Sequence, residues 1–274
     1  MKGCIWRLLV DPPQSAAKNM AVDEAIAEGF SLGKVPSTLR FYRWSRPSFS
    51  IGAFQKLNSE WIQCMEPRDG GSGVPLVRRI TGGRGLLHDH EMTYSVVSST
   101  ENPLFSSGIK GTYHHIAKGL LAGLQGLGID AEICDFTQHE GRDVNRHPLC
   151  FSSNSWYEIA FHGKKLIGSA QRRWRTHFLQ HGSLIIENSA AGSSLSQSSQ
   201  ISLISENQIT LSDLLSVLPS YGDLIQALKE GFETALGIRL VAGEISAYEQ
   251  NVISRLVREK YTDPRWNLNR KTKG

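Results

Sequence analysis

Cysteine is scarce in this sequence, with four residues among 274, and no two of them form a CxxC pair. This wide spacing predicts neither a disulfide framework nor a zinc site, and it indicates reduced thiols. No apolar run approaches the roughly 20 residues that a membrane-spanning helix needs. The apolar stretch at residues 4–10 is too short for a signal peptide. We therefore expect a cytoplasmic protein that holds no metal and does not contact a membrane.

An excess of charge of one sign is also missing. The chain carries 30 Lys and Arg against 26 Asp and Glu, a formal net charge of +4. This is far from the strongly basic balance of a dedicated nucleic-acid binder, but it suits an acidic protein partner. The sequence has no internal repeat, and its composition of 40% hydrophobic and 20% charged residues is that of a globular protein with a sizeable core.

Alternating apolar residues predict strands, and apolar residues three or four apart predict helices. Strands are expected at 4–10, 38–43, 49–54, 74–80, 91–98, 155–161, 165–171, 178–186 and 238–241. Helices are expected at 16–30, 108–127, 221–236 and 246–261. We expect 38–43 and 49–54 to be adjacent strands, and the three strands between 155 and 186 to form an antiparallel meander. The pattern predicts an α+β fold with a mixed, largely antiparallel sheet flanked by helices.

This organisation predicts one domain over residues 1–266, whose C-terminal helical part spans about 205–262. A basic tail is expected at 267–274, and we expect a monomer. Asp23 and Glu24 lie in the first predicted helix, where we expect solvated carboxylates.

The segment Arg78–Asp89 (RRITGGRGLLHD) combines a glycine turn with three arginines. Gly82 and Gly83 permit positive φ and close backbone approach. Arg78, Arg79 and Arg84 place permanent cations around the turn, so it can form a nest for a carboxylate, a phosphate or a thioester oxygen. The alternative is a β-hairpin turn with exposed arginines.

Cys150 is the leading nucleophile candidate because it lies at a predicted junction between a loop and a strand. The other cysteines fit the pattern of small buried hydrophobic residues. Lys165 follows across a predicted hairpin that brings it toward the same end of the sheet, where an ammonium lowers the pKa of a thiol. The alternative for Lys165 is an exposed strand lysine. Together these residues indicate acyl transfer at a cysteine without a metal.

An acyl chain needs an apolar slot, for which the candidate lining residues are Ile80, Leu86, Leu87 and Val96. The arginine-glycine turn would then hold the polar end of the acyl donor.

Four separated motifs resemble the lipoate/biotin protein ligase superfamily, and they are closest to its octanoyltransferase branch. They cover residues 19–25 (NMAVDEA), 78–95 (RRITGGRGLLHDHEMTYS), 150–158 (CFSSNSWYE) and 163–183 (GKKLIGSAQRRWRTHFLQHGS). Their order and spacing match along most of the chain. The resemblance implies the superfamily fold, a mixed sheet flanked by helices.

The resemblance also implies residue roles. Cys150 corresponds to the cysteine that carries the acyl group as a thioester, and Lys165 to the lysine that lowers the pKa of that thiol. The positions that correspond to substrate-binding residues are Arg79, Gly82, Gly83, Arg84, Gly85, Leu86, Leu87, His88, Gly168, Ser169, Ala170 and His181.

The implied reaction has two steps and needs no cofactor. Octanoyl-acyl carrier protein gives its octanoyl group to Cys150, and a lysine of a lipoyl domain then takes the group as an amide. The acceptor candidates are the H protein of glycine cleavage and the acyltransferase subunits of 2-oxoacid dehydrogenases. The run Arg172-Arg173-x-Arg175 suits an acidic carrier protein electrostatically, with a solvated strand end as the alternative.

The main alternative is an ATP-dependent lipoate–protein ligase, which would use ATP and Mg²⁺ to activate free lipoate or octanoate. Three features argue against it: the presence of Cys150, the arginine at position 84 where ligases usually carry a third glycine, and the absence of an accessory domain. A non-catalytic carrier-protein binding module is a further alternative, and Cys150 with Lys165 argues against it. An amidotransferase that moves octanoyl between lipoyl domains resembles this sequence less at the glycine turn.

Overall fold

The computed structural model describes residues 4–57, 73–134, 157–188 and 208–271. Eight strands form one mixed sheet in the spatial order β11-β1-β2-β6-β10-β9-β8-β7. Their bounds are β1 Cys4–Val10, β2 Thr38–Tyr42, β6 Glu91–Ser99, β7 Glu132–Cys134, β8 Glu158–Phe161, β9 Lys164–Arg173, β10 His177–Ile185 and β11 Ile238–Ala242. Strands β11, β1 and β2 pair in parallel, and all other neighbours pair antiparallel. The predicted α+β class, the mixed sheet and the meander β8-β9-β10 are confirmed.

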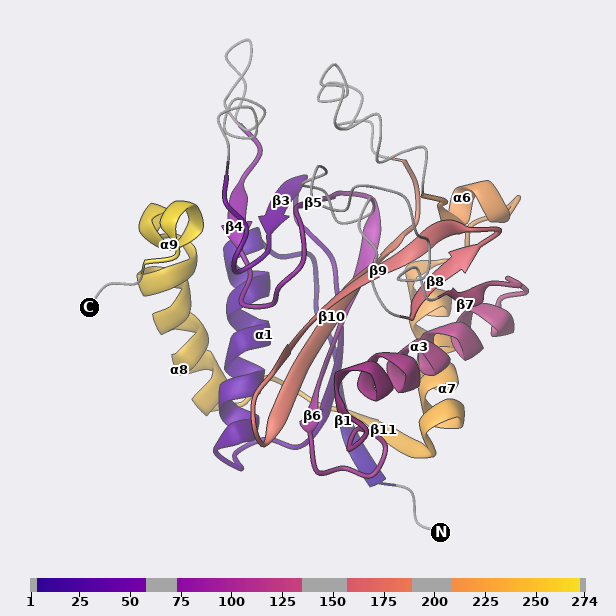
Figure 1. The fold of residues 1–274 in the computed structure, drawn as a ribbon, viewed down its shortest axis with the longest axis horizontal. Helices are drawn as coiled ribbons and strands as arrows, with labels where there is room; N and C mark the ends of the chain where they lie inside the picture. Colours follow the sequence, from indigo (N-terminus) through magenta and orange to yellow (C-terminus); the bar gives the residue numbers. More distant parts are fainter. Residues whose placement is uncertain (1–3, 58–72, 135–156, 189–207, 272–274) are drawn as a thin grey trace.

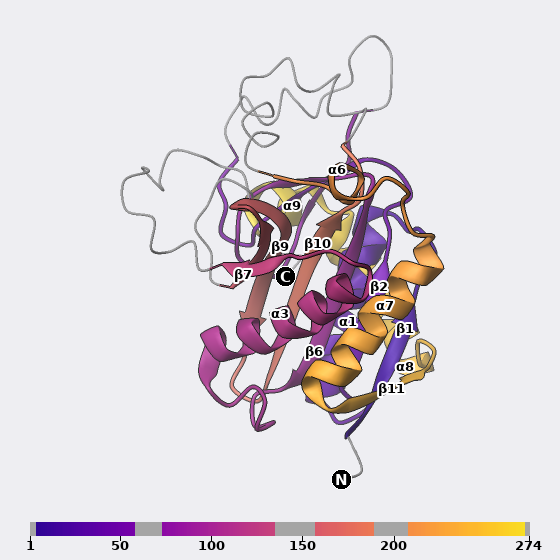
Figure 2. The same ribbon diagram turned by 90° about the vertical axis from the view of Figure 1, so that its right-hand side faces the viewer.

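Helices cover both faces of this sheet (Figures 1 and 2). Helices α1 Ala16–Ser31 and α8 Ala247–Leu256 lie on one face, and α3 Gly108–Gly126 and α7 Tyr221–Leu236 on the other. Each face therefore has its own hydrophobic core, one around Phe41 and Tyr94 and one around Met20 and Leu179. A central strand covered on both faces has no solvent side, and all nine residues of β10 are buried.

A second, three-stranded sheet corrects one prediction and excludes one alternative. It has the order β4-β3-β5, with β3 Ser48–Ile51 between β4 Leu76–Arg78 and β5 Leu86–His88. The segments predicted as adjacent strands, 38–43 and 49–54, therefore belong to different sheets. The glycine turn is not a hairpin turn either, because β4 and β5 do not pair with each other and both pair with β3. The turn carries the chain across β3, from one edge of the small sheet to the other.

The C-terminal part packs beside α1 and the small sheet (Figure 1). Helix α8 continues as a π-helix, η3 Val257–Tyr261, and is followed by α9 Pro264–Asn269; a short helix α6 Leu211–Leu214 precedes α7. Helix α9 crosses the boundary that we predicted for a basic tail at residue 267, because Asn267 is buried and accepts a hydrogen bond from the Arg78 backbone N–H. Among the described residues, no helix has both the length and the apolar character needed to cross a membrane.

Candidate functional site

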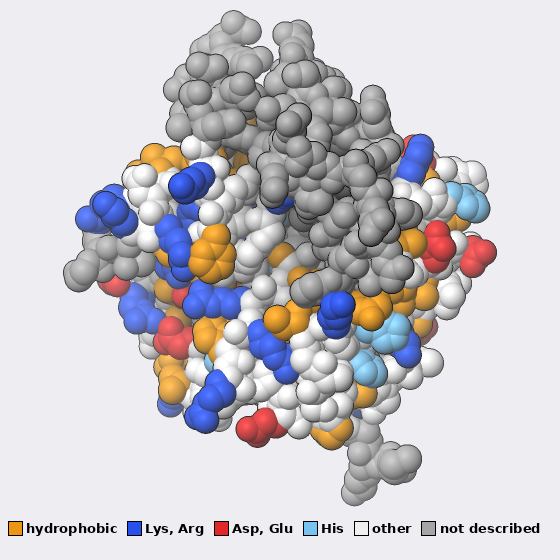
Figure 3. All heavy atoms as spheres, viewed as in Figure 1, with side chains coloured by type: hydrophobic (Ala, Val, Ile, Leu, Met, Phe, Trp, Pro, Cys, Tyr) orange, Lys and Arg blue, Asp and Glu red, His pale blue; other side chains and the backbone are white. Residues whose placement is uncertain are grey.

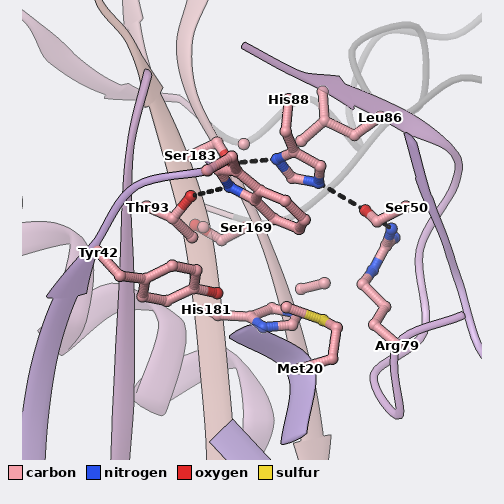
Figure 4. A pocket seen from close by; sticks show the side chains of 14 residues that line it. Met20, Tyr42, Ser50, Arg79, Leu86, His88, Thr93, Ser169, His181 and Ser183 are labelled. Carbon is pink, nitrogen blue, oxygen red and sulfur yellow. Dashed lines mark hydrogen bonds between the residues drawn. The ribbon is translucent and has the colours of Figure 1, made fainter. Parts of the chain in front are cut away.

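A pocket opens where the large and small sheets meet beside α1 (Figure 4). Its volume is about 340 Å³, counted with its opening to solvent. The lining residues come from α1, both sheets and the segments next to them: Met20, Tyr42, Trp44, Ser50, Arg79, Leu86, His88, Thr93, Gly168, Ser169, Ala170, His181, Gly182 and Ser183.

Seven of the predicted substrate-binding residues line this pocket. They are Arg79, Leu86, His88, Gly168, Ser169, Ala170 and His181. The remaining five, Gly82, Gly83, Arg84, Gly85 and Leu87, lie in the adjoining turn and in β5 and are not lining residues. Of the four residues predicted to form an apolar slot, only Leu86 lines the pocket. Ile80 and Val96 are buried in the two cores of the large sheet, and Leu87 packs against a small cluster around Phe49.

Arg79 holds the glycine turn from inside. Its guanidinium donates to the carbonyl oxygens of Gly82 and Arg84, at 3.0 and 2.7 Å, and to Ser50 Oγ at 2.9 Å. Gly52 makes room for the turn, because a Cβ at that position would lie 1.9 Å from the Gly83 carbonyl oxygen. The turn is thus fixed against the end of β3, with the Arg79 guanidinium at the pocket wall.

Arg78 does not place its cation around the glycine turn, where the sequence predicts it. Its side chain points away from the pocket and joins the small sheet to α9. Its buried guanidinium donates only to backbone carbonyl groups, those of Gly52, Ala53, Gln55, Trp266, Asn267 and Leu268. Burial, with a smaller effect of Arg270, lowers the pKa of Arg78. Arg78 is therefore a structural residue, and the turn presents fewer cations to a ligand than the sequence predicts.

His88 is held in the pocket wall by a hydrogen bond on each ring nitrogen. Its Nδ1 lies 2.8 Å from Glu91 Oε1, and its Nε2 lies 2.7 Å from Ser50 Oγ. Glu91 Oε1 also accepts hydrogen bonds from the hydroxyls of Thr93 and Ser183. The imidazole stacks on the Trp44 indole, with 3.8 Å between ring centroids and 13° between planes. The sequence motifs predict His88 as a site residue, but they predict neither Ser50 nor Glu91.

His181 has a second, similar arrangement. Its Nδ1 lies 3.0 Å from Asp23 Oδ2, and its Nε2 lies 2.7 Å from Thr81 Oγ1. Burial lowers the pKa of His181, and the hydrogen bond and charge of Asp23 only partly oppose this effect. The ring is therefore neutral near pH 7.

Asp23 is not the solvated carboxylate that we predicted, because only 1% of it is exposed. It accepts hydrogen bonds from Arg40, Tyr42 and Ser95 as well as from His181. Burial raises the pKa of this carboxyl, but Arg40 and His181 outweigh burial, and the pKa lies below its ordinary value. The sequence does carry a signal for this burial: the alanines around Asp23 leave α1 with no strongly polar face.

Glu24 also differs from the prediction of a solvated carboxylate. It accepts from Lys260 Nζ at 2.7 Å and from the Tyr261 hydroxyl, and so joins α1 to the π-helix.

Lys165 is buried and forms an ion pair with Glu158, so the alternative of an exposed strand lysine is wrong. The two residues lie on the neighbouring strands β8 and β9, which the turn at His162 and Gly163 connects. Lys165 is not a lining residue of the pocket. Its predicted partner Cys150 lies outside the described residues.

Two other cysteines fall within the described part of the chain. Cys4 is exposed and Cys134 is half-buried, and both are free thiols. The prediction of a buried hydrophobic role is therefore wrong for Cys4, whereas Cys64 lies outside the described residues. Burial, reinforced by Glu132, raises the pKa of the Cys134 thiol to about 11, so this thiol is no candidate nucleophile. No group of three His, Cys, Asp or Glu side chains within the described ranges is arranged to bind a metal ion.

The comparisons with known proteins all indicate the same family. The model of the lipoyl protein ligase A/B catalytic domain matches residues 15–233. Octanoyltransferase LipM of Brevibacillus brevis is 38% identical over 276 residues, covering 97% of this chain and 99% of the relative. Octanoyltransferase LipM of Kyrpidia tusciae is 40% identical over 274 residues, covering 96% and 98%. Among solved structures, Ta0514 of T. acidophilum, a candidate lipoate protein ligase with bound lipoic acid, superposes with a TM-score of 0.74 at 25% identity, covering 98% of this chain and 99% of that one.

Proposed function

The chain belongs to the family of lipoyl protein ligase A/B catalytic domains, and we infer from this premise that it is an octanoyltransferase of protein lipoylation. The observation that carries the assignment is the match to octanoyltransferases along nearly the whole chain. As an enzyme of this family it acts on lipoyl-domain proteins. The finer proposals below concern the acyl site, the covalent step and the identities of donor and acceptor.

The pocket between the sheets is the site for the octanoyl chain. An octanoyl group is an uncharged hydrocarbon apart from its carbonyl, so its burial is favourable only where no unpaired charge loses its hydration. The guanidinium in the wall, that of Arg79, donates to Ser50 Oγ and to two backbone carbonyl groups. Next to the wall, Asp23 forms an ion pair with Arg40, and Glu91 accepts hydrogen bonds from Thr93 and Ser183. Met20, Trp44 and Leu86 supply apolar surface in the pocket. Arg79 and its turn orient the polar end of the donor.

Cys150 is the nucleophile that carries the acyl group, and Lys165 favours its thiolate form. The thiolate attacks the donor carbonyl and the carrier thiol leaves. The ε-amine of a lipoyl-domain lysine then attacks the thioester, and an amide forms while Cys150 is released. This proposal is supported by the burial of Lys165 on a rigid strand. A buried ammonium acts on a nearby thiol with little solvent screening.

The donor is octanoyl-acyl carrier protein, and the acceptor is the glycine-cleavage H protein or a 2-oxoacid dehydrogenase subunit. An acidic donor suits the face in Figure 3, where Lys and Arg outnumber Asp and Glu. Of the run at 172–175, Arg172 and Arg175 are exposed, whereas Arg173 donates to Thr112 Oγ1 and the Phe105 carbonyl. Arg172 and Arg175 therefore meet the partner. The enzyme works as a cytoplasmic monomer without a cofactor.

Incubation with octanoyl-acyl carrier protein tests this function. We expect the mass of one octanoyl group on Cys150 without ATP, and its transfer to a lipoyl domain added afterwards. Cys150→Ser should still bind the donor and lose turnover, measured by intact-protein mass spectrometry. Full activity of Cys150→Ser would refute the covalent step.

A lipoate–protein ligase is the second candidate, favoured by the likeness to Ta0514, whose structure contains lipoic acid. A ligase would modify the lipoyl domain from free lipoate or octanoate, and only with ATP and Mg²⁺. The same assay run with free acid, with and without ATP, distinguishes the two. Modification that depends on ATP, with no adduct on Cys150, would replace the transferase assignment.

A further inference from the structure

Ser50 and His88 line the pocket and are bonded to each other (Figure 4). Glu91 binds the other ring nitrogen of His88, so the three residues form a hydrogen-bonded line. Glu91 Oε1 accepts from the Nδ1 side of the ring, at 2.8 Å, so the imidazole proton lies on Nδ1. The lone pair of Nε2 then faces the Ser50 hydroxyl, at 2.7 Å. A hydroxyl, an imidazole and a carboxylate in this order form the arrangement that activates a serine nucleophile.

The other hydroxyls of the pocket wall are bonded differently. Tyr42 donates to Asp23, and Thr93 and Ser183 donate to Glu91. Ser169 pairs with the Tyr94 hydroxyl. Ser183 Oγ also lies 3.5 Å from an imidazole nitrogen, His88 Nδ1, which is the nitrogen that binds Glu91. Among the pocket hydroxyls that the structure describes, Ser50 is the one bonded to His88 Nε2.

Two neighbours of the line favour reaction at Ser50. Arg79 Nη1 lies 2.9 Å from Ser50 Oγ, where its positive charge stabilises the negative charge that develops on the oxygen. The stacked Trp44 indole fixes the plane of the His88 ring. The nucleophile and its base are therefore preorganised on two strands of one sheet, β3 and β5.

The same molecule contains an internal comparison. Thr81, His181 and Asp23 repeat the order of hydroxyl, imidazole and carboxylate, at 2.7 and 3.0 Å. Thr81 and Ser50 are both buried, with 0% and 1% exposed, but Ser50 lines the pocket and Thr81 does not. Arg40 also binds Asp23. The Thr81 line therefore lacks access to a ligand, and Ser50 has it.

We propose that Ser50 is a second nucleophile of this pocket, which accepts acyl groups from thioesters or activated esters as an oxyester. Ser50 Oγ bonds to the acyl carbonyl carbon while its proton passes to His88 Nε2. The bond from that carbon to the leaving sulfur or oxygen breaks, and the leaving group takes the proton from His88. Water then attacks the carbonyl carbon of the oxyester and gives a proton to His88 Nε2. The bond from that carbon to Ser50 Oγ breaks, Ser50 Oγ takes the proton back from His88, and the carboxylic acid leaves. The pocket thus has a slow acyl-hydrolase activity that does not use Cys150.

A fluorophosphonate probe tests this directly in the full-length Cys150→Ala protein. The probe phosphonylates an activated serine whatever acyl chain the pocket normally holds, and peptide mapping should place the adduct on Ser50 and not on Thr81. Ser50→Ala should abolish labelling. His88→Asn keeps an N–H group and removes the base, so it should slow labelling by roughly 100-fold or more.

Ser98→Ala is the matched control, because Ser98 is also a buried serine, bonded to Ser37 far from the pocket. It should be labelled like the parent. Circular dichroism and thermal unfolding establish that each variant is folded. Absence of label on Ser50 in the folded Cys150→Ala protein, or labelling that His88→Asn leaves unchanged, overturns the proposal.

A second experiment uses octanoyl-acyl carrier protein and rests on the proposed function, because that function identifies the acyl chain as octanoyl. Cys150→Ala treated with octanoyl-acyl carrier protein should form an adduct that resists neutral hydroxylamine and yields to alkaline hydroxylamine, as oxyesters do. The two hypotheses fail separately. Octanoyl transfer by the wild type with no probe label on Ser50 refutes the second nucleophile alone. Probe label on Ser50 without any octanoyl transfer supports the second nucleophile and refutes the transferase.

Discussion

Lys165 and Glu158 bury an ammonium and a carboxylate together in the large sheet. Taking either charge alone out of water costs several kcal/mol, so the pair is retained only as a pair. Because Glu158 pairs with the lysine, it weakens the field of the lysine charge at any third group. How strongly Lys165 acts on a thiol is therefore set by its distance from Glu158 and from that thiol.

The first prediction concerns this pair. Lys165→Ala should raise the pH at which iodoacetamide labels Cys150, because the thiolate loses a nearby cation. The variant also leaves Glu158 buried without Lys165, so we expect the free energy of unfolding to fall by about 3–5 kcal/mol. Mass spectrometry across a pH series gives the labelling profile, and urea unfolding gives the stability.

Two companion variants separate these effects. Lys165→Met combined with Glu158→Gln removes both charges, so it should restore stability while the labelling profile stays shifted to high pH. Lys164→Ala removes an exposed lysine one position earlier and should leave the profile as it is. A profile that is identical in wild type and Lys165→Ala would show that the lysine does not act on the thiol.

At the scale of elements, the small sheet positions the pocket wall through close backbone contacts. The glycine turn lies against the end of β3 because Gly52 has no Cβ, and Arg78 fastens the same segment to α9. Arg79 then reaches Ser50 and the turn carbonyls from a fixed backbone. We therefore expect a change in this backbone to impair the substrate site more than it destabilises the hydrophobic core.

Gly52→Ala tests that expectation. The new Cβ would lie 1.9 Å from the Gly83 carbonyl oxygen, so the turn must move and Arg79 loses its carbonyl partners. We expect a cost of about 1–3 kcal/mol in stability, as for other overpacked sites. The octanoyl transfer rate should fall by more than this loss of folded protein explains.

The control for this variant is Gly126→Ala, where a Cβ at the end of α3 meets nothing within 4 Å. It should keep both stability and transfer. If Gly52→Ala transfers octanoyl at the wild-type rate, the position of the turn does not matter for substrate.

The sequence predicts elements well where the pattern is local. Residues 4–10, 91–98 and 221–236 form the expected strands and helix, with shifts of at most one residue. Strand pairing depends on distant partners, which is why 38–43 and 49–54 were wrongly joined: β2 pairs with β1 and β6, and β3 pairs with β4 and β5.

The site residues show the same difference between local sequence patterns and contacts with distant residues. Arg79, His88 and His181 were predicted through the motifs, and all three line the pocket. Asp23 was misjudged because a charged residue in a helix is usually solvated, and its burial depends on Arg40 and His181, at 17 and 158 positions away. Ser50 carries no local signal, since its role depends on His88 in another strand.

At the scale of the whole molecule, the buried charges join elements that lie far apart in the sequence. Arg7 of β1 binds Glu249 of α8, and Arg40 of β2 binds Asp23 of α1. Folding therefore fixes the protonation of groups in both cores, and stability must depend on pH. The histidines with resolved shifts, His114, His115, His177 and His181, all have a pKa lowered mainly by burial.

The sign of this dependence follows from the lowered pKa values. Below the ordinary histidine pKa of about 6.5, the unfolded chain takes up protons that the folded chain does not bind, so acid favours unfolding. The free energy of unfolding should be highest above this pH and should fall as the pH drops from 8 to 5. Each proton taken up contributes at most about 1.4 kcal/mol per pH unit. Urea unfolding at several pH values in this range gives the slope.

We expect the buried ring of His181 to be the largest single contributor to this slope, and His181→Asn tests this. Asparagine can still donate a hydrogen bond to Asp23, but it does not titrate, so the variant should show a shallower slope between pH 6.5 and 5. Above pH 7 the imidazole is neutral in both states, and there the variant and the wild type should differ by a constant amount. A wild-type stability that stays level or rises on acidification to pH 5 would contradict the lowered pKa values, and an unchanged slope in His181→Asn would assign the effect to the other three histidines.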